Sequence, residues 1–342
     1  MTFVWWEAVV AIAGVLVTAV AGVVFFAVHR VPKLQLRGAR VLVTGGSTGI
    51  GLDLAKAFAR KGAHVVISAR REDVLKAAVA EINAEVRHDA TTTLLHNAQY
   101  VVMDVGNDEK VAEACTSALT LLGGAPAFDV VVCCAGFSHP SRFLDCPAKT
   151  ARQMMEVNYF GCVNVARQVL GPMLAAKRGR IVLVSSMAGA APVAGFTTYA
   201  PTKAAVRAFA QSLDMEYACL GVRTQVVNPP DVATPGYELE NTVKSEECKQ
   251  ICAMGGASPF TARQMAEACI AGIENFSFQV NLGFDGVMLG YASACMEPPA
   301  SAIDLLGQFM FGGIIRLVGV VYTKMHYGIV SSVRRAEAAK KN

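Results

Sequence analysis

The chain has 342 residues, of which 53% are apolar and 17% are charged, and its formal net charge is +4. This length exceeds a minimal domain and suits one α/β domain with membrane attachments. The charge is too small and too dispersed for a nucleic-acid-binding protein, whereas the apolar excess indicates a surface that faces lipid or a lipid-like ligand.

Residues 1–30 predict a membrane anchor. The stretch 3–28 is almost wholly apolar, with Glu7 near one edge, and a helix of this length crosses a bilayer at about 1.5 Å per residue. Trp5 and Trp6 suit a membrane interface, and the basic residues after the span place the rest of the chain in the cytosol. A cleaved secretory signal is the alternative, but the basic n-region is missing and the apolar run is too long.

Residues 37–290 alternate between short strands and helices and are predicted to form one catalytic domain. Runs rich in β-branched residues predict strands at Arg40–Val43, His64–Ser68, Tyr100–Asp104, Val130–Cys133, Arg180–Ser185 and Thr224–Val227. The alternation predicts an α/β fold with a doubly wound, Rossmann-like parallel sheet that binds ligands at the carboxyl ends of its strands. The ten cysteines form no CxxC pair and are interpreted as reduced, buried thiols in a cytosolic setting; no metal site is predicted.

A glycine-rich turn, TGGSTGIG at 44–51, follows the first predicted strand and opens a helix at Leu52–Lys61. Glycines let the backbone approach a pyrophosphate, and the N–H groups of a helix N-terminus point towards it. Glycines alone would also suit an ordinary tight turn. The flanking strand and helix favour a dinucleotide site.

Arg70 predicts which dinucleotide binds. An NAD-binding unit usually has a carboxylate at the end of its second strand, where this chain has Ser68-Ala69-Arg70-Arg71. A guanidinium pairs with the 2′-phosphate of NADP, which a carboxylate would repel. The cofactor is therefore predicted to be NADPH. Alternatively, the arginines belong to a surface loop and are neutralised by Glu72 and Asp73.

Tyr199 and Lys203 are the centre of the predicted catalytic site. They stand four residues apart in YAPTK, on one face of a helix. A free phenol titrates near pKa 10, and lowering this by about 3 units requires roughly 4 kcal/mol, which Lys203 and an oxidised nicotinamide could supply. Ser186, at the end of a strand, could hold a carbonyl oxygen, and Asn158 could complete a proton relay.

Residues 291–342 predict a membrane-associated helical region and a polar tail. The stretch 303–330 is apolar, but Arg316, Lys324 and several glycines divide it into short pieces. Such pieces favour helices lying on the membrane or a re-entrant hairpin over a second span. A helical cap on the catalytic domain is an equal alternative. Residues 334–342 are predicted to be disordered.

These motifs resemble the short-chain dehydrogenase/reductase family over about residues 37–284. The likeness lies in TGGSTGIG, in VNYFG with Asn158, in the pair Ser185-Ser186 and in YAPTK. It implies that the phosphates bind Gly45, Ser47, Thr48, Gly49 and Gly51. It also implies that Arg70 binds the 2′-phosphate, that Asp104 contacts the adenine, and that Pro229, Val232 and Thr234 flank the nicotinamide.

The resemblance likewise implies catalytic roles. Tyr199 becomes the acid/base, Lys203 the ribose-binding lysine, Ser186 the carbonyl-orienting hydroxyl and Asn158 the relay residue. One departure is that Cys134-Ala135-Gly136 stands where the family usually has Asn-Ala-Gly, which puts the rigidity of the central strand in question. Family members are often dimers or tetramers, so a homo-oligomer is compatible with the sequence.

Within the family, residues 227–236 and 283–289 and the amphiphilic C-terminal region resemble members of sphingolipid biosynthesis. The implied reaction is NADPH-dependent reduction of a long-chain 3-keto amino alcohol, at the cytosolic face of the endoplasmic reticulum membrane. The acidic segment Glu238, Glu240, Glu246 and Glu247 is either a lid that attracts the substrate ammonium or a solvated helix face. Alternatives are a membrane-bound reductase of steroid, retinoid or acyl-chain ketones and a non-catalytic dinucleotide-binding protein.

Overall fold

The computed structural model describes residues 31–88, 98–254 and 258–340, together with residues 10, 14, 15, 18 and 22. The predicted membrane anchor at residues 1–30 therefore lies almost entirely outside the described residues.

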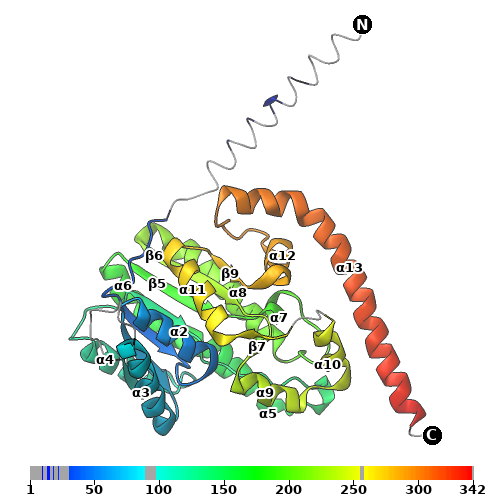
Figure 1. Ribbon diagram of the computed structural model, residues 1–342, viewed down its shortest axis with the longest axis horizontal. Helices are drawn as coiled ribbons and strands as arrows, with labels where there is room; N and C mark the ends of the chain where they lie inside the picture. Colours follow the sequence, from blue (N-terminus) through cyan, green and yellow to red (C-terminus); the bar gives the residue numbers. More distant parts are fainter. Residues whose placement is uncertain are drawn as a thin grey trace.

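A seven-stranded parallel sheet forms the centre of the molecule, in the order β3-β2-β1-β4-β5-β6-β9 (Figure 1). The chain winds outward from β1 to β3 and then returns to β4 beside β1, so the strand order reverses between β1 and β4, which is where doubly wound sheets bind ligands at the carboxyl ends of their strands. The strands are β1 Arg40–Thr44, β2 His64–Ala69, β3 Gln99–Val102, β4 Val130–Cys133, β5 Gly179–Val184, β6 Val222–Asn228 and β9 Gln279–Asn281. The predicted parallel α/β fold is confirmed.

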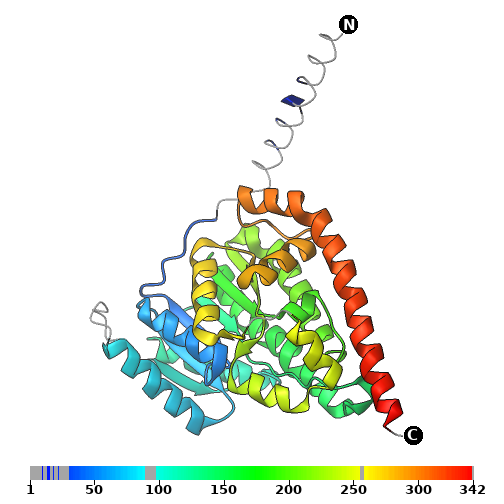
Figure 2. The ribbon, with the colours of Figure 1, turned by 45° about the vertical axis from the view of Figure 1, so that its right-hand side comes forward.

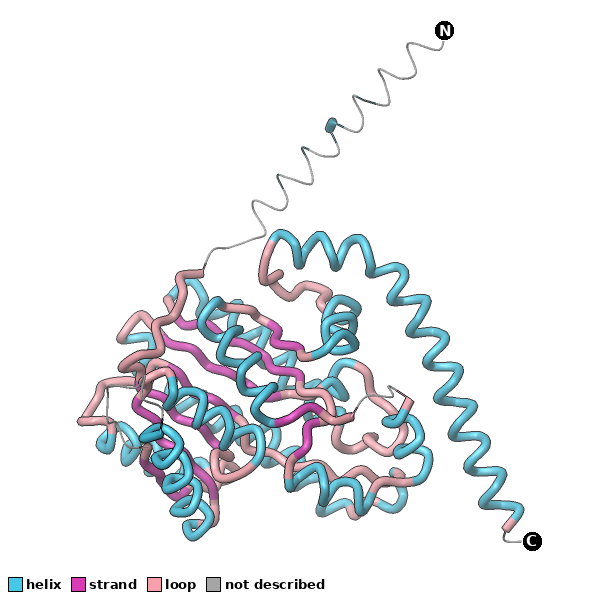
Figure 3. Tube along the Cα trace, in the orientation of Figure 1, coloured by secondary structure: helices cyan, strands magenta, loops and turns pink. Residues whose placement is uncertain are grey.

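Helices cover both faces of the sheet, as Figure 3 shows by the helices on either side of the strands. Because successive strand residues point to opposite faces, Val41 and Val43 of β1 pack on one side and Leu42 packs on the other. One layer contains α2 Gly49–Arg60, α3 Glu72–His88 and α11 Ala262–Asn275. The other contains α4 Asp108–Leu121, α6 Gly161–Ala175 and α8 Ala200–Tyr217.

Shorter elements join and cap this core. After β4 come η1 Phe143–Asp145, α5 Ala148–Met155, and a π-helical turn η2 Glu156–Phe160 that leads into α6. Other short elements are α7 Met187–Ala190, η3 Ala218–Leu220, α9 Pro235–Val243, α10 Glu246–Ala253 and α12 Gly283–Ser293. A separate two-stranded sheet pairs β7 Val232–Ala233 with β8 Phe260–Thr261. The segments after β4, β5 and β6 therefore supply the surroundings of the sheet's carboxyl edge.

The C-terminal region is one helix, α13 Ala302–Ala339, of 38 residues. The prediction of short pieces and of a disordered tail is wrong, because a glycine costs a helix only about 1 kcal/mol and does not interrupt its hydrogen bonds. Figures 1 and 2 show α13 first crossing over the domain and then running along its flank. Among the described residues it is the one helix long and apolar enough to cross a membrane, and its most apolar 18-residue stretch is 0% buried.

Both ends of α13 contact the catalytic domain. Near the start, Gly307 lies against the ring of Tyr291 in α12, where an added Cβ would be 2.8 Å from the ring. Near the end, Glu337 accepts a 2.7 Å hydrogen bond from the guanidinium of Arg142. Arg142 also binds both carboxylate oxygens of Glu247 in α10, at 2.7 and 2.8 Å. The last turns of α13 are thus fastened to α10 and to the segment after β4.

Candidate active site

The predicted phosphate-binding turn joins β1 to α2 and is tightly packed. Gly45 and Gly49 have φ values of +67° and +57°, which glycine adopts without strain. A Cβ on Gly51 would lie 2.3 Å from the carbonyl oxygen of Gly45. Helix α2 begins at Gly49 with Thr48 as its N-cap residue, and Ser47 is half-buried beside it. The turn therefore combines close backbone packing with the unpaired N–H groups of a helix N-terminus, which suits a diphosphate.

The segment after β6 lies across this turn. The methyl group of Thr234 is 3.1 Å from the position of a Cβ on Gly49. Val232 is buried in β7, and the carbonyl oxygen of Pro229 accepts a 3.1 Å hydrogen bond from the backbone N–H of Met187. Residues predicted to bind the phosphates and residues predicted to flank the nicotinamide thus lie at the same edge of the sheet.

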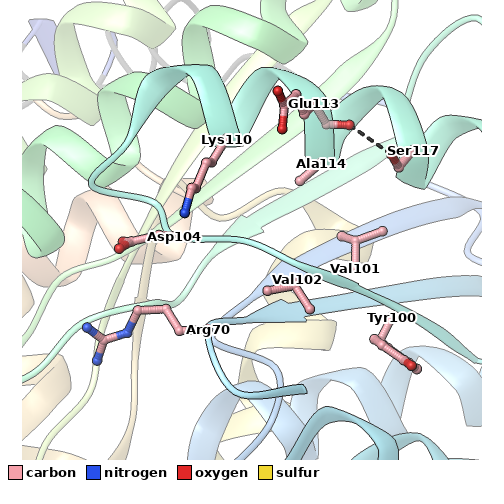
Figure 4. A pocket seen from close by; sticks show the side chains of 9 residues that line it. All are labelled: Arg70, Tyr100, Val101, Val102, Asp104, Lys110, Glu113, Ala114 and Ser117. Carbon is pink, nitrogen blue, oxygen red and sulfur yellow. Dashed lines mark hydrogen bonds between the residues drawn. The ribbon is translucent and has the colours of Figure 1, made fainter. Parts of the chain in front are cut away.

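Arg70 and Asp104 line one hollow of about 530 Å³ beside β3 and α4. Figure 4 shows their charged groups at one end of this hollow, with Lys110 near Asp104 and with Tyr100 at the far end. Arg70 is exposed at the end of β2. Asp104 follows β3, and its carboxylate accepts a 3.1 Å hydrogen bond from the backbone N–H of Gly106. This hollow is separate from the site around Tyr199, which does not line it.

Glu72 does not neutralise Arg70. Its carboxylate pairs with Lys76 at 3.0 Å and accepts a 3.1 Å hydrogen bond from the hydroxyl of Tyr100. Within residues 31–88, 98–254 and 258–340, Arg70 forms no salt bridge with any carboxylate, Asp73 included. The guanidinium is therefore available to an anionic ligand, as an arginine that binds a 2′-phosphate must be.

Ser186 and Tyr199 face each other beyond the carboxyl end of β5. Ser186 is the N-cap of α7, and its hydroxyl accepts a 3.1 Å hydrogen bond from the backbone N–H of Ala188. Tyr199 directly precedes α8 and is half-buried. Burial raises the pKa of its phenol above the ordinary value; the carboxylate of Glu240 and that of Asp231 raise it further, while the Ser186 hydroxyl lowers it. In the protein alone the phenol is therefore held in its protonated form.

Lys203 lies beneath the tyrosine ring, with its Nζ 5.8 Å from the ring centroid. Its side chain is buried, and Nζ donates a 2.9 Å hydrogen bond to the carbonyl oxygen of Val184. Burial lowers the pKa of Lys203, which the nearby thiols of Cys162 and Cys134 partly oppose. The lowering of the phenol pKa that the sequence assigns to Lys203 is therefore not present in the chain by itself.

Asn158 lies in the π-helical turn, and its side chain and that of Lys203 both approach Gly136. A Cβ on Gly136 would be 3.0 Å from Asn158 Oδ1 and 3.3 Å from Lys203 Nζ. The Asn158 side chain accepts from the N–H of Phe137 and donates to its carbonyl oxygen and to the Thr202 hydroxyl, each at 3.0 Å. It thereby fastens the segment after β4 to helix α8. The relay role of Asn158 stays a prediction.

Thr44 supports the backbone at the unusual Cys134. Its hydroxyl accepts hydrogen bonds from the backbone N–H groups of Cys134 and Ala135, at 3.1 and 3.3 Å. These contacts tie β1 to the end of β4 without requiring an asparagine side chain. The rigidity that the Cys134 substitution puts in question is thus maintained here by a neighbouring strand.

The acidic segment divides into solvated and inward-facing residues. Glu238 and Glu246 are exposed, whereas Glu247 is buried against Arg142. Glu240 Oε1 lies 3.1 Å from the Nζ of Lys244, whose side chain is only 2% exposed. The sequence analysis missed Lys244 and Asp231. The four-residue spacing of Glu240 and Lys244 was the available signal, since such a pair lies on one helical face.

Comparison with known proteins agrees with this geometry. Residues 39–244 match the family model for short chain dehydrogenases. A curated 3-ketodihydrosphingosine reductase from Bos taurus is 34% identical over 293 residues, covering 85% of this chain and 85% of that protein. A 3-dehydrosphinganine reductase from Danio rerio is also 34% identical, with 85% of each chain covered. An alcohol dehydrogenase structure from Thermococcus sibiricus, complexed with 5-hydroxy-NADP, is 25% identical with a TM-score of 0.56, and the match covers 68% of this chain and 88% of that one.

Proposed function

The chain belongs to the short-chain dehydrogenase family, and we propose that it reduces 3-ketodihydrosphingosine to dihydrosphingosine with NADPH. The observation that carries this substrate is the 34% identity to a curated 3-ketodihydrosphingosine reductase over 85% of both chains. A match over 85% of this chain necessarily includes the region of Tyr199 and the segment after β6, so the likeness is not confined to the cofactor site.

NADPH fits the residues at the carboxyl edge of the sheet. Gly45, Gly49 and Gly51 allow the close backbone packing that forms the turn at the start of α2, where the helix N–H groups would face a diphosphate. Arg70 has no carboxylate partner among the described residues and would bind the 2′-phosphate. NADPH supplies the hydride when bound. The alcohol dehydrogenase from Thermococcus sibiricus, which is similar in fold, binds a derivative of NADP.

Tyr199 would donate the proton to the carbonyl oxygen. Its raised pKa keeps the hydroxyl protonated in the protein alone, which is the form that a proton donor requires. Ser186, which faces the same hydroxyl, would hold the carbonyl oxygen in place while negative charge develops on it. Lys203 would bind the cofactor ribose and stabilise the phenolate after proton transfer, and Asn158 lies beside it to return the proton.

We further propose that the protein works at a membrane, at the cytosolic face of the endoplasmic reticulum. The apolar stretch 3–28 would anchor the chain. The contacts of α13 at Gly307 and Glu337 lie on the same catalytic domain, roughly 45 Å apart along the helix. Because one domain holds both ends of α13, we expect the helix to lie against the bilayer and not to cross it. A long-chain lipid substrate would then reach the site from the membrane.

A panel assay tests the proposed function. Purified full-length protein in detergent would be given NADPH or NADH with 3-ketodihydrosphingosine, a steroid ketone, a retinal or an acyl-chain ketone, and absorbance at the nicotinamide band would be followed. The proposal expects turnover of 3-ketodihydrosphingosine with NADPH at the highest kcat/KM. A higher kcat/KM for a steroid or retinoid would reassign the substrate, and binding of NADPH without turnover of any ketone would indicate a non-catalytic protein.

A further inference from the structure

Two carboxylates, Asp231 and Glu240, stand beside the catalytic tyrosine. They come from different elements, since Asp231 follows β6 and Glu240 belongs to α9. The Phe196 ring lies 5.5 Å from the Tyr199 ring, and the Nζ of Lys244, which pairs with Glu240, lies 6.0 Å from the Phe196 ring. Both carboxylates raise the pKa of the Tyr199 phenol. They help to keep the phenol protonated, but they oppose formation of the phenolate that proton donation leaves behind. Their position therefore calls for an explanation other than proton transfer.

Lys244 balances only half of this charge. Its Nζ lies 3.1 Å from Glu240 Oε1 and 4.6 Å from the ring centroid of Tyr237. Tyr237 in turn donates a 3.4 Å hydrogen bond to the carboxylate of Asp231. Asp231 and Glu240 carry two negative charges and Lys244 carries one positive charge, so the group has a formal charge of −1. Such a site complements a ligand with a single positive charge.

Polar groups around Glu240 retain unused hydrogen-bonding capacity. The Ser138 hydroxyl, in the segment after β4, is shielded from solvent, faces Glu240 and has no hydrogen-bond partner of ordinary geometry among the described residues. Lys244 Nζ is likewise shielded, and besides its ion pair it has no hydrogen-bond partner of ordinary geometry in the described part of the chain. Shielded polar groups without partners are uncommon in proteins and are usually satisfied by a water, an ion or a ligand. The Glu240 side chain is 16% exposed, so it remains open to such a ligand.

We propose that Glu240, supported by Asp231, binds the substrate ammonium and so makes the enzyme specific for a ketone with an adjacent amine, with Ser138 available to the neighbouring hydroxyl. This rests on the proposed function, since it assigns the recognition of that substrate. In 3-ketodihydrosphingosine the amine is on the carbon next to the ketone. When the carbonyl oxygen lies at Tyr199 and Ser186, the ammonium is placed within a few ångströms of the tyrosine hydroxyl, where the carboxylates act.

Glu240→Gln tests the inference, with Glu238→Gln as the matched control. Glu238 is in the same helix but exposed, so its variant should behave as wild type. For each protein, KM would be compared for 3-ketodihydrosphingosine and for its N-acetyl analogue, which has no positive charge. An inhibition constant replaces KM if the analogue turns over too slowly. A lost charge-assisted hydrogen bond predicts a rise of about 10-fold to 100-fold in KM for the amine in Glu240→Gln.

The comparison with the neutral analogue separates a loss of ammonium recognition from a folding defect, because a folding defect would affect both ligands. The inference expects the KM or inhibition constant of the analogue to change by less than about twofold in Glu240→Gln, because no charge is lost to it. An equal rise for both ligands, or no rise for either, would overturn the inference while leaving the reductase function in place. Wild-type protein that fails to reduce 3-ketodihydrosphingosine would instead overturn the proposed function. Asp231→Asn should give a smaller rise in the same direction and repeats the test from a second element.

Discussion

Arg70→Gln should change the choice of cofactor without changing the chemistry. The guanidinium is exposed at the end of β2 and forms no salt bridge with the carboxylates of the described chain, so its removal leaves no internal charge unpaired. Hydrogen bonds to charged groups contribute about 1.5–3 kcal/mol. Solvent screening at an exposed position places Arg70 at the lower end of this range, and about 1.4 kcal/mol corresponds to a tenfold change in affinity. KM for NADPH should therefore rise about tenfold.

The assay compares NADPH and NADH with the same ketone. NADH has no 2′-phosphate, so its KM should change by less than about twofold, and kcat with NADPH should be nearly unchanged because Arg70 is not beside Tyr199. Arg71→Gln is the control, because it removes the same charge from the next residue, which is also exposed. Equal effects on both cofactors, or a larger effect from Arg71→Gln, would refute the assignment of Arg70 to the 2′-phosphate.

Two structural predictions concern the cofactor turn and the fastening of α13. Gly51→Ala should weaken NADPH binding by at least about tenfold, since its Cβ would lie 2.3 Å from the Gly45 oxygen; Gly171→Ala in helix α6, where nothing lies within 4 Å of the added Cβ, should bind normally in the same titration. Arg142→Met should lower the free energy of unfolding in urea by about 1–3 kcal/mol, because the Glu247 side chain is only 3% exposed and loses both hydrogen bonds from Arg142, which leaves Arg334 at 3.9 Å as its cation. Glu337→Gln should leave the unfolding midpoint close to that of wild type, because that carboxylate is 43% exposed. Hydrogen bonding to Arg142 lowers the pKa of Glu247 to about 2, so this stabilisation should be complete above the unfolded pKa of about 4.3 and should be lost as pH falls towards 2. An unchanged midpoint for Arg142→Met, or normal NADPH binding by Gly51→Ala, would contradict these assignments.

The parallel sheet could be predicted because its strands are buried on both faces and therefore read as continuous apolar runs, such as Val130–Cys133. Strand β9 could not be predicted from the sequence. It has only three residues, Gln279–Asn281, and two of them are polar. Its pairing with β6 is set by contacts between distant parts of the chain, for example the Asn228 amide that bonds Asn281 at 3.0 Å.

The positions of the glycine turn, Ser186, Tyr199 and Lys203 could be predicted because each is part of a local motif with fixed spacing. The charged group around Tyr199 could not, since Asp231 and Glu240 meet only after the chain has folded. The continuity of α13 was also missed, because glycines weaken a helix by propensity, whereas the contacts at Gly307 and Glu337 that hold this helix are not local.

The central claim is that hydride from NADPH and a proton from Tyr199 reduce the C3 ketone. It is tested most directly with NADPH deuterated at the transferred position of C4, in wild type and in Tyr199→Phe. Wild type should place deuterium on C3 of dihydrosphingosine, one per turnover. Tyr199→Phe should lose at least about 99% of kcat while its affinity for NADPH stays within about threefold, since the phenol hydroxyl gives the proton but does not hold the diphosphate. Tyr199→Phe that turns over at the wild-type rate, or product without deuterium at C3, would contradict the claim.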